Sequence, residues 1–104
     1  MDISELKKIS DKSYEVATEK KNALEKARSR MLLAHDGHIF SADAQTIGLV
    51  KALAEDHDRL YILDVNDNPA LIDDPEKFLK NLKQKNQEAL NTYHNAYEML
   101  KKLG

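Results

Sequence analysis

Residues 79–103 read LKNLKQKNQEALNTYHNAYEMLKKL, and this stretch decides the fold. Apolar and small side chains recur in it at alternating spacings of three and four, which is the pattern of a heptad seam. The seam positions are Leu79, Leu82, Asn86, Ala89, Tyr93, Ala96, Leu100 and Leu103. A helix from Pro75 through this stretch would be about 43 Å long. Only a second long helix could cover it.

Asn86 is the polar member of this seam. A seam asparagine can set the register and oligomeric state of paired helices at some cost in stability. Alternatively, this turn of the helix protrudes into water, as the many Asn and Gln residues around it indicate. Both interpretations stay open. Tyr93 and Tyr97 are predicted to be core or interface rings.

The second long helix is predicted from Ile3 to Arg30, because this segment lacks Pro and Gly and is rich in Glu, Lys and Ala. Its apolar stripe consists of Ile3, Leu6, Ile9, Val16, Ala17, Ala23, Leu24, Ala27 and Met31. Alanines on this stripe and on the C-terminal seam permit two helix backbones to approach closely. We expect the long helices to pair antiparallel, or one of them to cover a sheet and project beyond it.

Asp36-Gly37 between two apolar runs predicts a β-hairpin with a type I′ turn, which needs positive φ at both central residues. The register that follows pairs Leu33 with Phe40, Ala34 with Ile39 and His35 with His38. One face then carries Met31, Leu33, Phe40 and both histidines, and the other carries Leu32, Ala34 and Ile39. Both faces are largely apolar, so we expect both to be covered.

A second hairpin is predicted from the turn signal of residues 66–69, between apolar runs at residues 60–65 and 70–72. This arrangement would pair Val65 with Ala70 and Leu63 with Ile72. Two hairpins of similar plan suggest one small four-stranded antiparallel sheet with a short helix on one face.

The short middle helix is predicted from residue 44 to about residue 55, with Asp43 as its N-cap and Ser41 as the alternative. Its buried stripe consists of Ile47, Val50, Leu53 and Ala54. Asp73 or Asp74 caps the last helix ahead of Pro75. The chain is therefore predicted to be one α+β domain, residues 1–104, in the order αββαββα. It comprises a long helix (1–30), a hairpin–helix–hairpin module (31–74) and the heptad-bearing helix (75–104).

Charge is spread unevenly along the 104 residues, whose net charge is −2. Basic residues exceed acidic ones by two in residues 1–35 and by three in residues 75–104, whereas residues 36–74 hold nine acids against two bases. So acidic a segment disfavours nucleic acid as a partner, because phosphate binding needs a cationic footprint. It suits a basic patch on another copy or on another protein, unless its acids are simply solvated.

The chain has no Cys, which excludes disulfides and thiolate chemistry and favours the cytoplasm. No apolar run approaches the roughly 20 residues needed to span a bilayer, so we expect no membrane partner.

Two constellations begin like metal sites. His35 and His38 face the same way across the first hairpin, but no third ligand stands at a local spacing, and two polar residues at an exposed tip are the alternative. Residues 64–68 open like a calcium loop, yet Pro69 stands where that loop needs Gly, so a turn stabilised by Asx side chains is favoured. No nucleotide-binding or nucleophile motif occurs, so we expect neither an enzyme nor a cofactor.

Two stretches, DGHIFSAD (residues 36–43) and YILDVNDNP (residues 61–69), followed by an acid-capped terminal helix, resemble small uncharacterised proteins of tailed bacteriophages. The resemblance implies a phage setting, such as virion assembly or interference with a host protein, and hence the host cytoplasm.

The function we expect is a non-catalytic protein–protein interaction or assembly module that forms a homo-oligomer. Its interface would join the seam and Tyr97 to Leu6, Ile9, Val16 and Leu24 of the same or another copy. The alternative is a monomeric acidic adaptor or inhibitor that binds a basic host protein.

Overall fold

The computed structural model describes the backbone of residues 3–103 and the side chains of residues 13–103. Its elements are α1 (Ile3–Arg30), β1 (Leu32–His35), β2 (His38–Ser41), α2 (Ala44–Ala54), β3 (Leu60–Leu63), β4 (Pro69–Ile72) and α3 (Pro75–Leu103). This order of helices and antiparallel hairpins confirms the predicted α+β fold, αββαββα.

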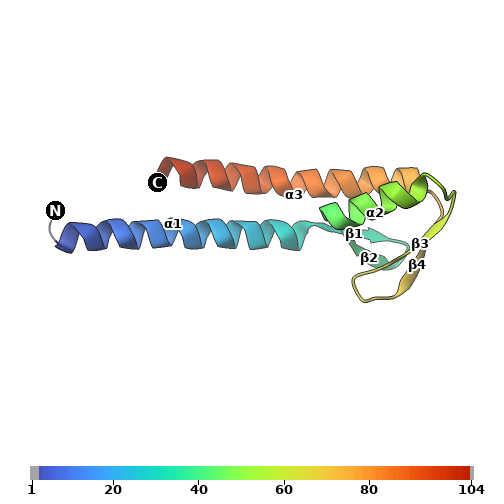
Figure 1. Ribbon diagram of the computed structural model, residues 1–104, viewed down its shortest axis with the longest axis horizontal. Coiled ribbons are helices and arrows are strands. Elements are labelled where there is room, and N and C mark those ends of the chain that lie inside the picture. The colour runs from blue at the N-terminus through green and yellow to red at the C-terminus, as the bar shows by residue number, and fades with distance from the viewer. Residues whose placement is uncertain (1–2, 104) are drawn as a thin grey trace.

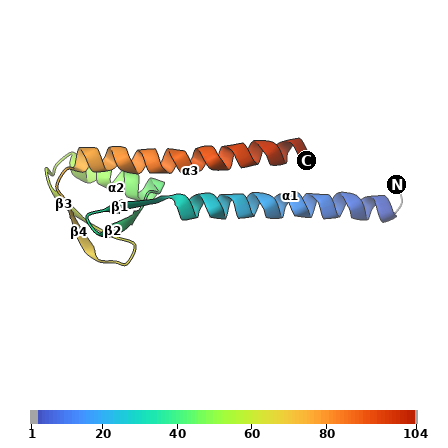
Figure 2. The same ribbon diagram turned by 180° about the vertical axis from the view of Figure 1, so that it is seen from behind.

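The molecule is long and thin. α1 and α3 lie side by side and antiparallel, with the start of α1 and the end of α3 far from the hairpins and α2 (Figure 1, Figure 2). Its extents are 66 × 23 × 20 Å, and its radius of gyration is 19.4 Å, whereas a compact domain of this length would have about 13 Å. We call α1 together with residues 89–103 of α3 the stalk, and residues 31–88 the head.

The first hairpin has the predicted register, with Leu33 opposite Phe40 and His35 opposite His38. Its turn residues, Asp36 and Gly37, have φ values of 48° and 79°, as a type I′ turn requires. Leu33 and Phe40 are buried, but Ile39 is 45 % exposed. The expectation that both faces of this hairpin would be covered is therefore wrong.

The second hairpin differs from the predicted register. Leu60 pairs with Ile72 and Leu63 with Pro69, so β3 ends at Leu63 instead of continuing to Val65. The cause is Asp64, whose Oδ1 accepts hydrogen bonds from the backbone N–H groups of residues 66 and 68 at 2.8 and 2.9 Å. These bonds fold residues 64–68 into the connecting loop and move the strand pairing by three residues.

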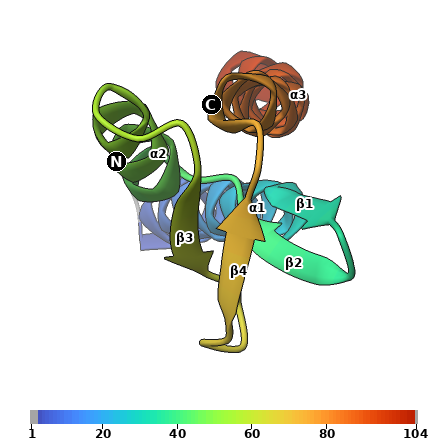
Figure 3. The same cartoon turned by 90° about the vertical axis from the view of Figure 1, so that its right-hand side faces the viewer.

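The two hairpins remain separate two-stranded sheets, so the predicted four-stranded sheet is wrong (Figure 3). One backbone hydrogen bond joins them, from the N–H of Val65 to the carbonyl of Ile39 at 2.8 Å. Since Val65 lies in the loop after β3, the contact does not extend into a ladder.

The core lies where the hairpins, α2 and the first turns of α3 meet. Its largest fully buried side chains are Phe40, Phe78, Ile72, Leu82 and Val50. The rings of Phe40 and Phe78 meet edge to face, with centroids 5.0 Å apart, a favoured aromatic geometry. Of the stripe predicted for α2, Val50 is buried, Ile47 and Leu53 pack partly buried against this core, and Ala54 is half-buried.

The stalk buries much less. On α1, Ala27 is buried, Val16 and Leu24 are half-buried, and Ala17 is exposed. The predicted contributions of Ile3, Leu6 and Ile9 to this stripe lie outside the described side chains. The N-terminal end of α1 extends beyond the C-terminal end of α3 (Figure 1).

Both internal helix starts have acidic caps. Asp43, not Ser41, caps α2, because its Oδ1 accepts from the N–H of Thr46 at 2.8 Å. At α3, Asp74 accepts from the N–H of Lys77 at 3.2 Å. Sequence spacing thus located both caps, and for α3 the structure selects the second of the two predicted aspartates.

Gly37 and Gly48 provide a matched test of this backbone. Gly37→Ala should lower the free energy of unfolding by about 1 kcal/mol, because its φ of 79° disfavours a Cβ atom. Gly48→Ala should raise it by about 1 kcal/mol, because Gly48 lies inside α2 and an added Cβ would meet no atom within 4 Å. Urea denaturation measures the change in unfolding free energy of each variant. Changes of the same sign in both variants would contradict this interpretation.

Candidate functional site

Most of the predicted interface residues contribute to contacts within one chain. Leu82 and Ala89 are buried, and Leu79 packs partly buried against the core. Along the stalk, Tyr93, Ala96 and Leu100 are half-buried, whereas Tyr97 and Leu103 are 38 % and 59 % exposed. The seam therefore covers the head and then α1 of the same chain, and its C-terminal end is the part left accessible.

Asn86 has a role that neither sequence interpretation contained. Its Nδ2 donates a hydrogen bond to the carbonyl of Ala42 at 3.0 Å and lies 4.0 Å from the sulfur of Met31. Ala42 is fully buried, and its own N–H donates to the carbonyl of Met31 at 2.7 Å. Asn86 thus ties α3 to the two segments that lead into and out of the first hairpin.

His35 and His38 are half-buried, so they do not form the exposed polar tip of the alternative interpretation. The ring of His35 lies 5.1 Å from that of Phe78, and its Nε2 is 3.3 Å from a carboxylate oxygen of Asp36. His38 Nδ1 donates to Oδ2 of Asp64 at 2.7 Å, since a carboxylate can only accept. Among the described residues, no three His, Cys, Asp or Glu side chains are placed to hold a metal ion.

Asp64 is the hydrogen-bond partner of His38 that sequence reasoning missed. Its side chain is only 4 % exposed and accepts hydrogen bonds from His38 and from two backbone N–H groups of its own loop. The hydrogen bond from His38, together with those from the N–H groups of Asn68 and Asn66, holds the pKa of Asp64 below its ordinary value. One signal was available: alternation places residue 64 on the same buried face as Leu60 and Ile62, where an acid needs partners.

The loop of residues 64–68 is the Asx-stabilised turn favoured over a calcium loop. Asp67 adopts a left-handed backbone with φ of 61°, and the N–H of Asp64 donates to the carbonyl of Asn68 at 2.9 Å. Because Asp64 directs both oxygens to protein donors, this loop is closed by its own hydrogen bonds.

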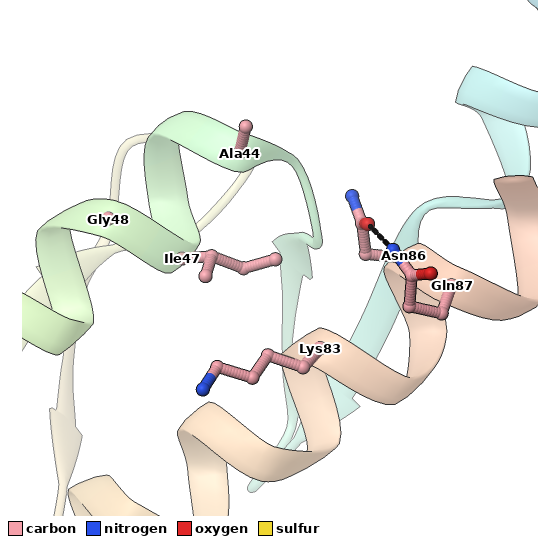
Figure 4. A pocket seen from close by; sticks show the side chains of 6 residues that line it. All are labelled: Ala44, Ile47, Gly48, Lys83, Asn86 and Gln87. Carbon is pink, nitrogen blue, oxygen red and sulfur yellow. Dashed lines mark hydrogen bonds between the residues drawn. The ribbon is translucent and has the colours of Figure 1, made fainter.

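A pocket of about 430 Å³ lies between α2 and α3. Its lining consists of Ala44, Ile47, Gly48, Lys83, Asn86 and Gln87 (Figure 4). The amide of Asn86 already binds the carbonyl of Ala42 and accepts from Gln87 at 3.0 Å. The lining contains no carboxylate, imidazole or hydroxyl group, so this pocket offers neither an acid–base pair nor a metal site.

The third histidine of the head, His57, lines a different pocket. His57 lies 3.0 Å through Nδ1 from the carbonyl of Leu53 and lines a pocket of about 210 Å³ with Asp58, Asp73 and Asp74. Neither His35 nor His38 lines this pocket, so the structure does not bring His57 or Asp58 to the first hairpin.

The stalk carries an open groove of about 320 Å³ on one side. Val16 and Lys20 of α1 line it together with Tyr97, Leu100 and Lys101 of α3. The ammonium nitrogen of Lys20 lies 5.6 Å from the centre of the Tyr97 ring, a cation–π distance. Lys20 therefore lies along an apolar surface with its charge beside an aromatic ring.

A second apolar feature adjoins this groove. Leu90, Tyr93 and Tyr97 recur at spacings of three and four on α3, and we call them the tyrosine flank. The two tyrosine rings lie 6.2 Å apart, and Leu90 and Tyr97 are 37 % and 38 % exposed. The flank and the groove share Tyr97 and so form one continuous apolar surface on the stalk.

Comparison of the chain with protein-family models, with curated proteins and with solved structures found no match. Within residues 3–103, no helix combines the length and apolar character needed to cross a membrane.

Asn86→Ala should lower the free energy of unfolding by about 1–3 kcal/mol, because it leaves the buried carbonyl of Ala42 without its side-chain donor. The matched control is Gln87→Ala, an exposed neighbour for which we expect a change within about 0.5 kcal/mol. Chemical denaturation measures both variants. Equal changes in unfolding free energy for the two variants would contradict the conclusion that Asn86 links α3 to the first hairpin.

Asp64 should make the protein sensitive to acid. A carboxyl group whose pKa is lowered by folding stabilises the fold fully above its unfolded pKa of about 3.9, and this contribution is lost as pH falls through the lowered value. Asp64→Asn should flatten the fall of unfolding free energy as pH decreases below about pH 5. Asp67→Asn, an exposed change in the same turn, should leave the wild-type slope. Equal slopes of unfolding free energy against pH for wild type and Asp64→Asn would contradict the assignment of this acid sensitivity to Asp64.

Proposed function

We propose that this protein is a non-catalytic protein–protein interaction module that associates with a second copy through its stalk. The observation that carries the proposal concerns the outer part of the stalk, residues 13–26 and 90–103, which has no closed core. None of the described side chains in residues 13–26 of α1 or 90–103 of α3 is buried. Long helices in proteins derive most of their stability from an apolar face that packs against other elements.

A two-helix layer leaves apolar surface on both sides of the line where the helices meet. On one side lie the tyrosine flank and the groove lined by Val16, Lys20 and Leu100. Elsewhere on the same helix, Met99 and Leu103 are 68 % and 59 % exposed. A second stalk laid on this surface would make a four-helix bundle, the arrangement in which such faces are normally buried.

A twofold pairing suits this surface. In a twofold dimer the same patch of both copies meets, so one set of residues suffices to form the contact. The tyrosine flank of each copy would then enter the neighbourhood of the partner's groove. Tyrosine is favoured at such interfaces, because its ring provides apolar area while its hydroxyl remains hydrated.

The three histidines of the head are each held by a contact within the chain. His38 is engaged with Asp64, His35 lies against Phe78, and His57 lies beside the carbonyl of Leu53. Each of these side chains has a structural contact that orients it. A phage setting and a place in the host cytoplasm belong to the proposal only through the sequence resemblance to small proteins of tailed bacteriophages.

Leu90→Glu/Tyr97→Glu should abolish self-association without unfolding the chain, since both side chains are partly exposed in one copy. Burying these charges between two copies should weaken association by about a hundredfold or more. Mass measured by light scattering after size exclusion, over a wide concentration range, reads out the effect, and circular dichroism reports helicity.

The matched control is Asn91→Glu/Asn95→Glu, which adds the same charge to exposed polar positions of the same helix. The proposal requires this control to dimerise like the wild type. A wild-type mass of one chain, 11.9 kDa, at every concentration would contradict the proposal. That result would favour the monomeric acidic adaptor.

A further inference from the structure

The head carries exposed apolar side chains that its own core does not use. They are Leu32, Ala34, Ile39, Tyr61, Leu63 and Val65, which we call the outer strip. Tyr61 and Leu63 are 67 % and 61 % exposed. Isolated apolar residues are common on protein surfaces, but a run of them that crosses two sheets marks an interaction site.

Backbone geometry makes the strip continuous. In residues 60–65, burial alternates at every position, so Tyr61, Leu63 and Val65 point outward while Asp64 points inward. The N–H of Val65 bonds to the carbonyl of Ile39, and the side chains of their preceding residues, Asp64 and His38, meet on the inner side. Ile39 and Val65 therefore lie beside each other on the outer side.

The first hairpin extends the strip further. Ile39 is the cross-strand partner of Ala34, which places these two side chains on the same outer face. Leu32, two residues before Ala34, lies on that face as well and is 45 % exposed. The strip thus runs from the strand β3 through the loop contact at Val65 to the strand β1.

The exposed charged residues in the two hairpin turns are acidic. Asp36 in the first turn has a side chain that is 74 % exposed, and Asp67 in the second turn is exposed. Residues 36–74 contain only two basic residues, Lys51 and Arg59, and the Arg59 side chain bonds to Asp73 at 3.2 Å. An anionic membrane or a nucleic acid would be repelled from such a surface. A cationic partner would be attracted.

We infer that the outer strip is a docking surface for a basic segment of another protein, whose apolar side chains cover Tyr61, Leu63, Val65 and Ile39 while its lysines or arginines face the surrounding aspartates. This inference goes beyond self-association and does not depend on it. The strip lies at the end of the molecule opposite the free ends of the stalk (Figure 1, Figure 2). Both surfaces are therefore accessible at once.

The test uses amide chemical shifts of the full chain, titrated with a short peptide of alternating leucine and lysine. We expect shifts centred on β3, the loop of residues 64–68 and the first hairpin, and weaker binding as ionic strength rises from about 0.05 to 0.5 M. A leucine–glutamate peptide of the same length should cause no such shifts. Shifts spread over the acidic pocket of Asp58 and Asp73 instead would overturn the inference.

Tyr61→Lys/Leu63→Lys should weaken binding of the leucine–lysine peptide by about tenfold or more. The matched control is Leu49→Lys/Ala52→Lys, which adds the same charge to exposed positions of α2 outside the strip. This control should bind within about threefold of the wild type. If both double variants weakened peptide binding equally, the effect would come from net charge alone, and the inference would be overturned.

Two further outcomes separate this inference from the proposed dimer. The stalk variant Leu90→Glu/Tyr97→Glu should bind the peptide as the wild type does, whether or not the wild type dimerises. Strip resonances that move on dilution of the protein alone would place a second copy on the strip. That result would overturn the inference that a basic segment of another protein binds there.

Discussion

The contact of the first turns of α3 with the first hairpin, inside the common core of the head, holds the rest of the structure together. Phe78 and Leu82 are almost fully buried there, and each such side chain contributes about 1.5–3 kcal/mol through removal from water. Asn86 continues the same contact by binding the carbonyl of Ala42. Because α3 then runs on without a break to Leu103, the head determines where the stalk begins and which face of α3 meets α1.

Local chemistry in the sequence was sufficient to predict the elements and much of their detail. The bounds of both long helices, the Asp36-Gly37 turn and the cap at Asp43 all follow from short-range rules, and the structure confirms them. What sequence reasoning could not reach depends on side chains that meet across the chain. Asp64 shortens β3 through its own loop and binds His38, and Asn86 finds a carbonyl 44 residues away.

The two candidate surfaces differ in how far sequence could predict them. The heptad pattern located the stalk, but it could not tell how much of the seam α1 of the same chain would cover. The outer strip was visible as the apolar second face of the first hairpin, yet its connection to Tyr61 and Leu63 depends on the bond between Val65 and Ile39. We propose a division of roles between them, in which the stalk joins copies and the acidic, apolar head faces a partner.

Hydrogen exchange of backbone amides along α3, measured at low and high protein concentration, tests the central claim most directly. Residues 75–88 should be strongly protected at both concentrations, because the core of the head covers them. Residues 90–103 should exchange quickly in dilute protein and become protected as concentration rises, since a second stalk then covers them. Protection of residues 90–103 that is the same at every concentration would contradict association through the stalk.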